Sequence, residues 1–128
     1  MRLVSVLVAA AIVIGLFVLG EKPYAGSLFP TPWDKLAHIS VYGTIAILLW
    51  IGAGNGPHRP GAVALFVLAI GLLDELHQAG IPGRSADVSD LVADAVGIGI
   101  AFYLLRSRKG SAAREAARQS QPALKGNP

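Results

Sequence analysis

Four long apolar runs leave most of the charged residues of this chain in short segments between and beside them. Each run, taken with its polar flanks, reaches the roughly 20 residues that a helix needs to cross a bilayer. A bilayer offers no water to backbone polar groups, so only helices and closed barrels can span it. Runs of this length indicate helices. The apolar runs are Leu3–Leu19, Leu36–Ala53, Gly61–Leu73 and Leu91–Leu105. We expect four transmembrane helices, near residues 3–20, 34–53, 61–79 and 86–106.

The composition agrees with this interpretation. The chain is 53% hydrophobic and only 15% charged, whereas soluble domains have about 25% charged residues. We therefore predict an all-α polytopic membrane protein, with a bundle of four transmembrane helices in residues 1–106. Residues 107–128 are rich in small and basic residues and predict a disordered cytoplasmic tail, in which a short helix around Ala112–Gln119 is an alternative. The chain has no cysteine, which excludes disulfides, thiolate metal sites and cysteine nucleophiles.

The first apolar run has a second interpretation. Arg2 precedes it, and Ala25, Gly26 and Ser27 follow it, as in a cleaved signal peptide. The apolar core of a signal peptide is about 7–15 residues long, and Leu3–Leu19 is longer. We favour a retained helix.

Lysine and arginine residues indicate the orientation, because they concentrate in cytoplasmic segments. Both termini are therefore expected in the cytoplasm of a multi-pass protein of the cell membrane, and the 21–33 and 80–85 loops outside. The predicted inner group is Arg2, Arg59, Arg106, Arg108, Lys109, Arg114, Arg118 and Lys125, against Lys22, Lys35 and Arg84 outside.

Polar residues from separate segments converge on the predicted outer level of the membrane. Asp87, Asp90 and Asp94 form one stripe of their helix, which continues into Gly97 and Ala101. Small residues let helices pack closely, so this stripe should face the bundle. The candidate catalytic residues are Glu75 and His38, and the candidate ligand-binding residues are Arg84, Lys35, Asp34, Tyr42, Gln78, Asp87, Asp90 and Asp94.

Structural roles compete for some of these residues. Thr31 can cap a helix with Asp34 in its first turn, and Ser85 can cap the last helix with Asp87 in its first turn. Lys35 can simply extend to the interface. Asp74 can reach headgroups or water.

Caps do not account for the excess of acids. Six acids share this level with Lys22, Lys35, Arg84 and the titratable His38. An acid at the centre of a bilayer costs about 2.5–3.5 kcal/mol, and less towards the interface. Some of these acids must therefore be protonated, reach water or hold an external cation. The acids are Asp34, Asp74, Glu75, Asp87, Asp90 and Asp94.

Two stretches carry a family resemblance. "DKLAHISVYG" contains D-K-x-x-H-x-x-x-Y. "DELHQAGIPGRSADVSDLVADAVGIGIAFYL" contains D-E-x-x-Q, then P-G-R-S, then an Asp and an Asn/Asp-x-x-G sequence. Together they resemble the VanZ-like family over residues 1–106. The matching positions are Asp34, Lys35, His38, Tyr42, Asp74, Glu75, Gln78, Pro82, Gly83, Arg84, Asp87, Asp90, Asp94 and Gly97.

The resemblance implies an integral membrane protein of the cell envelope, with an association with glycopeptide (teicoplanin) resistance. The chain departs from the family at two places. Ala79, Gly80 and Ile81 stand where the family often has an aromatic residue before the P-G-R turn, and Asp94 stands where it often has Asn.

We expect the outer polar site to bind or modify an envelope lipid or a lipid-linked precursor, with Arg84 holding an anionic group. Membrane lipids or such precursors, and no nucleic acid, are the expected partners. In an enzymatic alternative, Glu75 is the general base and His38 its partner. No cofactor is predicted, but a divalent cation held by Glu75, Asp90 and His38 is an open alternative.

Two further functions stay open. Acids within the membrane can mark an ion- or proton-coupled carrier, although the predicted inner half of the membrane contains none of them. The polar residues can also serve only to lock a structural helix bundle together.

Overall fold

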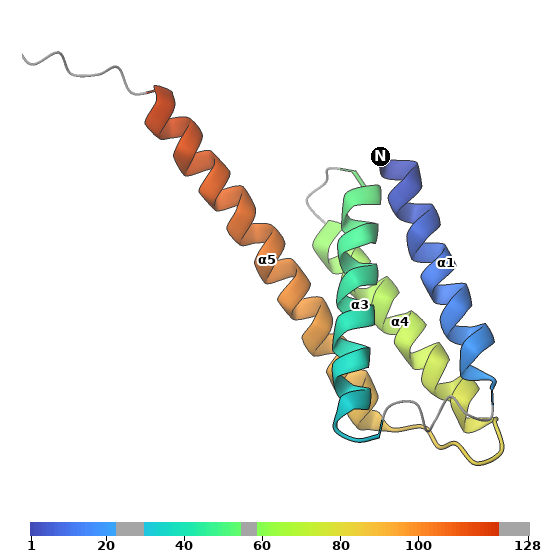
Figure 1. Cartoon of the computed structure of the whole chain (residues 1–128). Helices are drawn as coiled ribbons and strands as arrows, with labels where there is room; N and C mark the ends of the chain where they lie inside the picture. Colours follow the sequence, from blue (N-terminus) through green and yellow to red (C-terminus); the bar gives the residue numbers. More distant parts are fainter. Residues whose placement is uncertain (23–29, 55–58, 121–128) are drawn as a thin grey trace, which may run out of the picture.

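The computed structural model describes residues 1–22, 30–54 and 59–120, and within these ranges the chain forms four helices (Figure 1). Each helix contains a segment long and apolar enough to cross a membrane, and in the last helix this segment is Val88–Arg108. The predicted all-α bundle of four transmembrane helices is confirmed. The helices are α1 (Arg2–Gly20), α3 (Trp33–Gly52), α4 (Arg59–Ala79) and α5 (Val88–Ser120).

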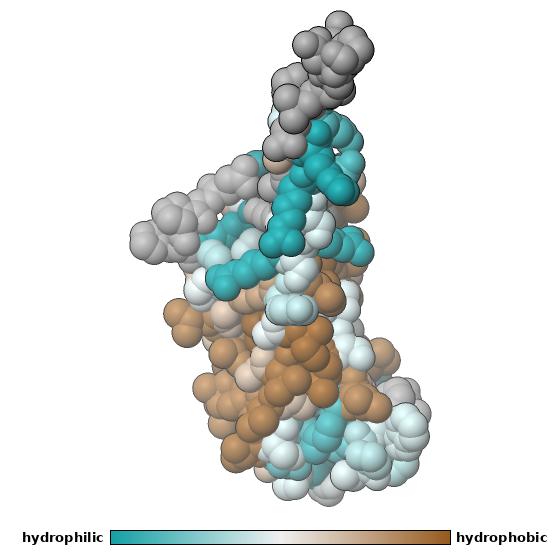
Figure 2. Space-filling model, turned by 90° about the vertical axis from the view of Figure 1, so that its left-hand side faces the viewer, coloured by the Kyte–Doolittle hydropathy of each residue, from teal (hydrophilic) through white to brown (hydrophobic). Residues whose placement is uncertain are grey.

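Helix α3 is the centre of the bundle and packs against α1, α4 and α5. On the face shown in Figure 2, a band of hydrophobic side chains is bounded by hydrophilic surface at both ends. This pattern matches a bilayer, in which apolar side chains face the acyl chains and polar side chains face the headgroups.

Glycine residues allow the close approach of α3 and α5. A Cβ at Gly43 would lie 3.0 Å from the carbonyl oxygen of Gly97, and a Cβ at Gly97 would collide with the carbonyl group of Ile39. Association of helices in lipid depends on close packing, because acyl chains are as apolar as leucine. Gly97 and Ala101 are both buried, as their place on the Asp90–Asp94 stripe predicts.

The apolar core lies between α3, α4 and α5. The buried residues of helix α1 are the small residues Ser5 and Ala9, and its larger side chains are partly buried or exposed. The buried core residues are Tyr42, Ile45, Ala46, Val63, Val67, Ile98 and Ala101.

The last helix continues into the C-terminal segment, and the alternative of a short helix around Ala112–Gln119 lies within it. Helix α5 continues to Ser120 and extends beyond the bundle (Figure 1). Residues 107–120 are mostly alanine, arginine, glutamate, glutamine and serine, without a proline, and most of these have high helix propensity. The helix therefore does not need tertiary contacts to continue. The remainder of the predicted tail, residues 121–128, lies outside the described residues.

Candidate functional site

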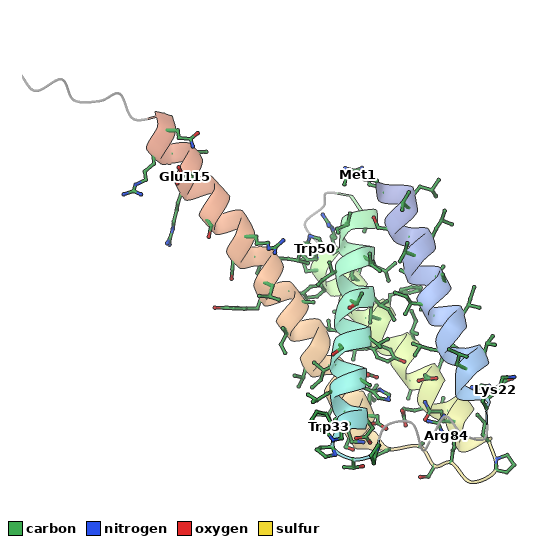
Figure 3. All side chains as sticks on the ribbon, in the orientation of Figure 1. Met1, Lys22, Trp33, Trp50, Arg84 and Glu115 are labelled. Atoms are coloured by element: carbon green, nitrogen blue, oxygen red, sulfur yellow. The ribbon has the colours of Figure 1, made fainter. Side chains whose placement is uncertain are left out.

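Polar side chains of α3, α4, α5 and the loop before α5 meet at the end of the bundle that lies away from Met1. Figure 3 shows Trp33 and Arg84 at this end and Met1 at the other. The structure brings together all ten residues that the sequence proposes for a site, and adds Asp74. We call this group the polar cluster. It comprises Asp34, Lys35, His38, Tyr42, Asp74, Glu75, Gln78, Arg84, Asp87, Asp90 and Asp94.

Lys35 connects the start of α3 to the start of α5. Its Nζ lies 3.2 Å from Oδ2 of Asp34, 3.0 Å from Oδ2 of Asp87 and 2.5 Å from Oδ1 of Asp90. Lysine has three ammonium hydrogens to donate, so one residue can bond all three carboxylates. Lys35 is thus an ionic junction between two helices rather than a side chain that only reaches the interface.

The helix starts differ from the predicted caps. Helix α3 begins at Trp33 with Pro32 as its N-cap, and the hydroxyl of Thr31 donates instead to Oδ2 of Asp34, 3.3 Å away. The loop before α5 stays non-helical through Asp87, so Ser85 is too distant from the first turn to cap it. Asp87 caps α5 itself, because its Oδ1 accepts the backbone N–H of Ser89 at 2.8 Å.

A tight turn places Arg84 beside the end of α4. The N–H of Arg84 bonds the carbonyl of Ile81 at 3.1 Å, with Pro82 and Gly83 between them. Gly83 has a φ of 83°, which suits glycine in the third position of a type II turn that has proline in the second. From this turn the guanidinium donates to Oε1 of Gln78 at 2.8 Å and to the carbonyl of Gly20 at 3.0 Å. Among the described residues, Arg84 forms no ion pair.

Asp74 belongs to the polar cluster, although the sequence suggests that it reaches headgroups or water. It is 3% exposed. Its Oδ2 accepts hydrogen bonds from the hydroxyl of Tyr42 at 3.3 Å and from Nε2 of Gln78 at 2.9 Å. Gln78 lies four residues after Asp74 on the same helix, and that spacing is the signal that could have identified the pair.

His38 and Asp94 pair across α3 and α5. Nδ1 of His38 lies 2.9 Å from Oδ1 of Asp94, whose other oxygen, Oδ2, is buried without a hydrogen-bond partner among the described residues. A Cβ at Gly71 on α4 would collide with Oδ2 of Asp94. Glycine at this position therefore makes the space that the carboxylate occupies.

Glu75, like Asp74, is a buried acid of α4. It is 4% exposed, and its Oε2 accepts the backbone N–H of Asp87 at 2.7 Å. Its Oε1 is buried and has no hydrogen-bond partner among the described residues. One ligand atom each of Glu75, His38 and Asp90 lies within 4.8 Å of the other two. The two candidate catalytic residues are therefore neighbours.

Asp87 remains ionised at neutral pH. Hydrogen bonds to Ser89, and then to Lys35, lower the pKa of the Asp87 carboxyl to about 2. The polar cluster contains six carboxyl groups, while Lys35 and Arg84 are its permanent cations. The excess of acids that the sequence predicts thus persists when the helices are assembled.

A cavity of about 720 Å³ adjoins the polar cluster. Apolar side chains of α1 and α3, among them Leu16 and Val41, form most of its wall. The polar residues that line it are Thr31, Asp34, His38, Tyr42, Asp74, Gln78, Arg84 and Asp90. Such a cavity can accept an amphiphile, because apolar and polar parts of one molecule would find matching surfaces.

Comparison with known proteins supports the family resemblance that the motifs carry. No curated protein and no solved structure matches the chain. Residues 4–109 match the family described as VanZ/LLP1, so the chain belongs to the VanZ/LLP1 family.

Proposed function

We propose that this membrane protein binds an envelope lipid or a lipid-linked precursor, with the headgroup at the polar cluster and an acyl or isoprenoid chain against α1 and α3. The observation that carries the proposal is the lining of the cavity, which is apolar along α1 and α3 and polar at the polar cluster. Drug-sized ligands occupy cavities of roughly 300–1,000 Å³ that are mostly apolar and have a few placed polar groups. The cavity here, at about 720 Å³, has this size and character.

The apolar wall suits a hydrocarbon chain. Ile12, Leu16 and Leu19 follow one face of α1 and line the cavity, and Val41 lines it from α3. Gly15 also lines the cavity, and a Cβ at that position would meet no atom within 4 Å. The wall therefore has free space beside α1, where a lipid chain would pack.

The polar end suits a headgroup that contains both an anion and hydrogen-bond donors. The guanidinium of Arg84 lines the cavity, and arginine binds phosphate and carboxylate with paired N–H groups. The carboxylates of Asp34 and Asp90 also line it and would accept hydrogen bonds from sugar hydroxyls or amines. A phosphate-linked sugar or amine offers both kinds of group.

The headgroup site lies on the extracytoplasmic side in this proposal. The N-terminus and the extension of α5 lie at the end of the bundle away from the polar cluster (Figure 1). The extension contains the basic residues Arg108, Arg114 and Arg118, and such residues concentrate on the cytoplasmic side. This orientation puts the cavity where envelope precursors are exposed, and it extends the proposal to the glycopeptide (teicoplanin) resistance that the family resemblance implies.

A purely structural bundle fits the site less well. Polar residues that serve only to join helices would be expected to satisfy one another, yet Oε1 of Glu75 and Oδ2 of Asp94 are buried without partners among the described residues. An ion-coupled carrier also fits less well, because the acids within the described membrane segments lie at one end.

Modification of the bound lipid is the second candidate. It rests on the proximity of Glu75 and His38, a carboxylate and an imidazole that together can take and return a proton. If this candidate is correct, Glu75→Gln retains bound lipid but loses conversion of a co-purified precursor, measured by lipid mass spectrometry.

The test of lipid binding compares Arg84→Ala with Arg106→Ala, a variant of an exposed arginine near the far end of the membrane-spanning segment of α5. Each protein is purified in a mild detergent, and its lipids are identified by mass spectrometry. We expect stoichiometric lipid on the wild type and on Arg106→Ala, and at least roughly a tenfold loss on Arg84→Ala, in keeping with the loss of about 1.5–3 kcal/mol for a charged hydrogen bond. Equal lipid content in all three proteins would contradict the proposal. Teicoplanin sensitivity of cells that carry each variant tests the link to resistance.

A further inference from the structure

We propose that His38, Glu75 and Asp90 bind one divalent cation within the polar cluster. One ligand atom from each residue lies within 4.8 Å of the other two. Two ligands of one ion are separated by at most twice the metal–ligand bond, or about 4–5 Å for bonds of 2.0–2.6 Å. The three residues are therefore close enough to share an ion after small side-chain movements.

Glu75 supplies an observation that is independent of this clustering. The residue is 4% exposed, and its Oε1 is buried with no hydrogen-bond partner among the described residues. A buried carboxylate oxygen without a partner is costly. The backbone N–H of Asp87 holds the other oxygen, Oε2, in place. A cation bound at Oε1 would satisfy the remaining oxygen.

His38 is oriented as a metal-ligating histidine usually is. Its Nδ1 lies 2.9 Å from Oδ1 of Asp94. With Asp94 ionised and the ring neutral, the carboxylate can only accept a hydrogen bond, so Nδ1 donates it and Nε2 keeps a lone pair for a metal. Metal-bound histidines commonly donate the other ring N–H to a carboxylate in this way, which fixes the tautomer and the direction of the ring.

Asp90 divides its two oxygens between an ammonium group and the proposed ion. Oδ1 lies 2.5 Å from Nζ of Lys35, whereas Oδ2 lies 3.9 Å from Nε2 of His38. The second distance is too long for a hydrogen bond but is within reach of two ligands on one ion. Lys35 therefore positions Asp90 without occupying the oxygen that faces His38.

The charges of the polar cluster favour a divalent ion. Six carboxyl groups surround two permanent cations, so an added charge of +2 offsets much of the excess. One imidazole nitrogen with carboxylate oxygens suits Mn²⁺ or Zn²⁺ better than Mg²⁺, because Mg²⁺ prefers oxygen ligands and retains its water. The ion would also lie near the cavity, where it could contact an anionic headgroup.

The experiment measures Mn²⁺ binding to the full chain in detergent without added lipid, by electron paramagnetic resonance, with Zn²⁺ and Mg²⁺ as competitors. The inference does not rest on the proposed lipid binding, since the three side chains supply the ligands and no lipid is added. We expect one Mn²⁺ per wild-type chain, displaced by Zn²⁺ and not by an equal concentration of Mg²⁺. Absence of saturable binding to the folded wild type would overturn the inference.

Substitutions of single residues test whether the cation binds at His38 and Glu75. Glu75→Gln and His38→Gln each remove one ligand and should weaken Mn²⁺ binding by at least roughly tenfold, and Asp94→Asn, which removes the charged partner of His38, should weaken it by about 10–100-fold. Glu21→Gln is the matched control, because Glu21 lies on the same level but is largely exposed and contacts His77. Wild-type affinity in both Glu75→Gln and His38→Gln, or an equal loss in Glu21→Gln, would overturn the assignment. If one ligand variant does not fold, the other still decides.

Discussion

His38 on α3 and Asp94 on α5 join their side chains across the bundle, with 2.9 Å between Nδ1 and Oδ1, although they lie 56 positions apart in the sequence. The pair lies beside the close contact of Gly97 with Ile39. A hydrogen bond and a close glycine contact thus join the same two helices at adjacent positions. Both features can be tested separately.

The His38–Asp94 bond should contribute to the stability of the bundle. We expect a coupling free energy of about 0.6–1.7 kcal/mol in a double-mutant cycle of His38→Ala and Asp94→Ala, the range for hydrogen bonds between transmembrane helices. Reversible unfolding in mixed micelles supplies the measurement. The control cycle pairs Asp94→Ala with Ser40→Ala, because Ser40 is exposed on α3. Additive effects of His38→Ala and Asp94→Ala would show that the pair is not coupled.

Gly97 should be far more sensitive to substitution than Gly99. A Cβ at Gly97 would collide with the backbone of Ile39, whereas a Cβ at Gly99 would meet nothing within 4 Å. We expect Gly97→Ala to lower the free energy of unfolding by about 1–3 kcal/mol, as overpacking does, and Gly99→Ala to leave it nearly unchanged. The two variants are matched, because each adds one methyl group to the same helix. Equal stabilities would mean that α3 and α5 do not approach closely at this point.

Some of these relationships follow from the sequence and others do not. The stripe of Asp90, Asp94, Gly97 and Ala101 is predictable because the helical period alone fixes which residues share a face. The partners of that stripe depend on how each helix is rotated and shifted against its neighbours. The junction at Lys35 and the bond from the Asp87 N–H to Glu75 therefore emerge only from the assembled bundle.

The burial of Asp74 and the length of α5 also have physical causes that a sequence motif does not show. The angle of Asp74 on its helix differs from that of Glu75, which leaves contact with water as an alternative, but in the bundle Tyr42 and Gln78 donate hydrogen bonds to Asp74. The polar composition of the C-terminal segment leaves disorder and a helix as alternatives, and the helix propensity of residues 107–120 favours the helix. The family, in contrast, can be recognised from the spacing of motifs in the sequence, because that spacing does not depend on how the helices pack.

The depressed pKa of Asp87 should be measurable directly. Hydrogen bonds to Ser89 and Lys35 hold it at about 2, so the stabilising effect of the ionised group is complete above the usual value of 3.8 and is lost as the pH falls through about 2. Carboxyl carbon NMR of labelled protein gives the midpoint. Lys35→Gln should raise it towards 3.8. A wild-type midpoint near 3.8 would show that the contacts of Asp87 do not persist.

The orientation can be tested with single cysteines, because the chain has none of its own. Ser85 and Ser111 are exposed, and they lie on opposite sides of the membrane-spanning segment Val88–Arg108. We expect a membrane-impermeant maleimide to label Ser85→Cys in intact cells and Ser111→Cys only after permeabilisation. The reverse pattern would place the polar cluster in the cytoplasm.

Lipid retention by Gly15→Leu tests the central claim, that the cavity beside the polar cluster holds a lipid, most directly. Leucine at this position would project into the cavity, since a Cβ there meets nothing within 4 Å, and no residue of the polar cluster would be changed. Gly61→Leu is the matched control, because Gly61 is equally free of neighbours and does not line the cavity. Native mass spectrometry should find lipid on the wild type and on Gly61→Leu, and bare protein for a folded Gly15→Leu. Undiminished lipid on Gly15→Leu, or a lipid-free wild type, would contradict the account.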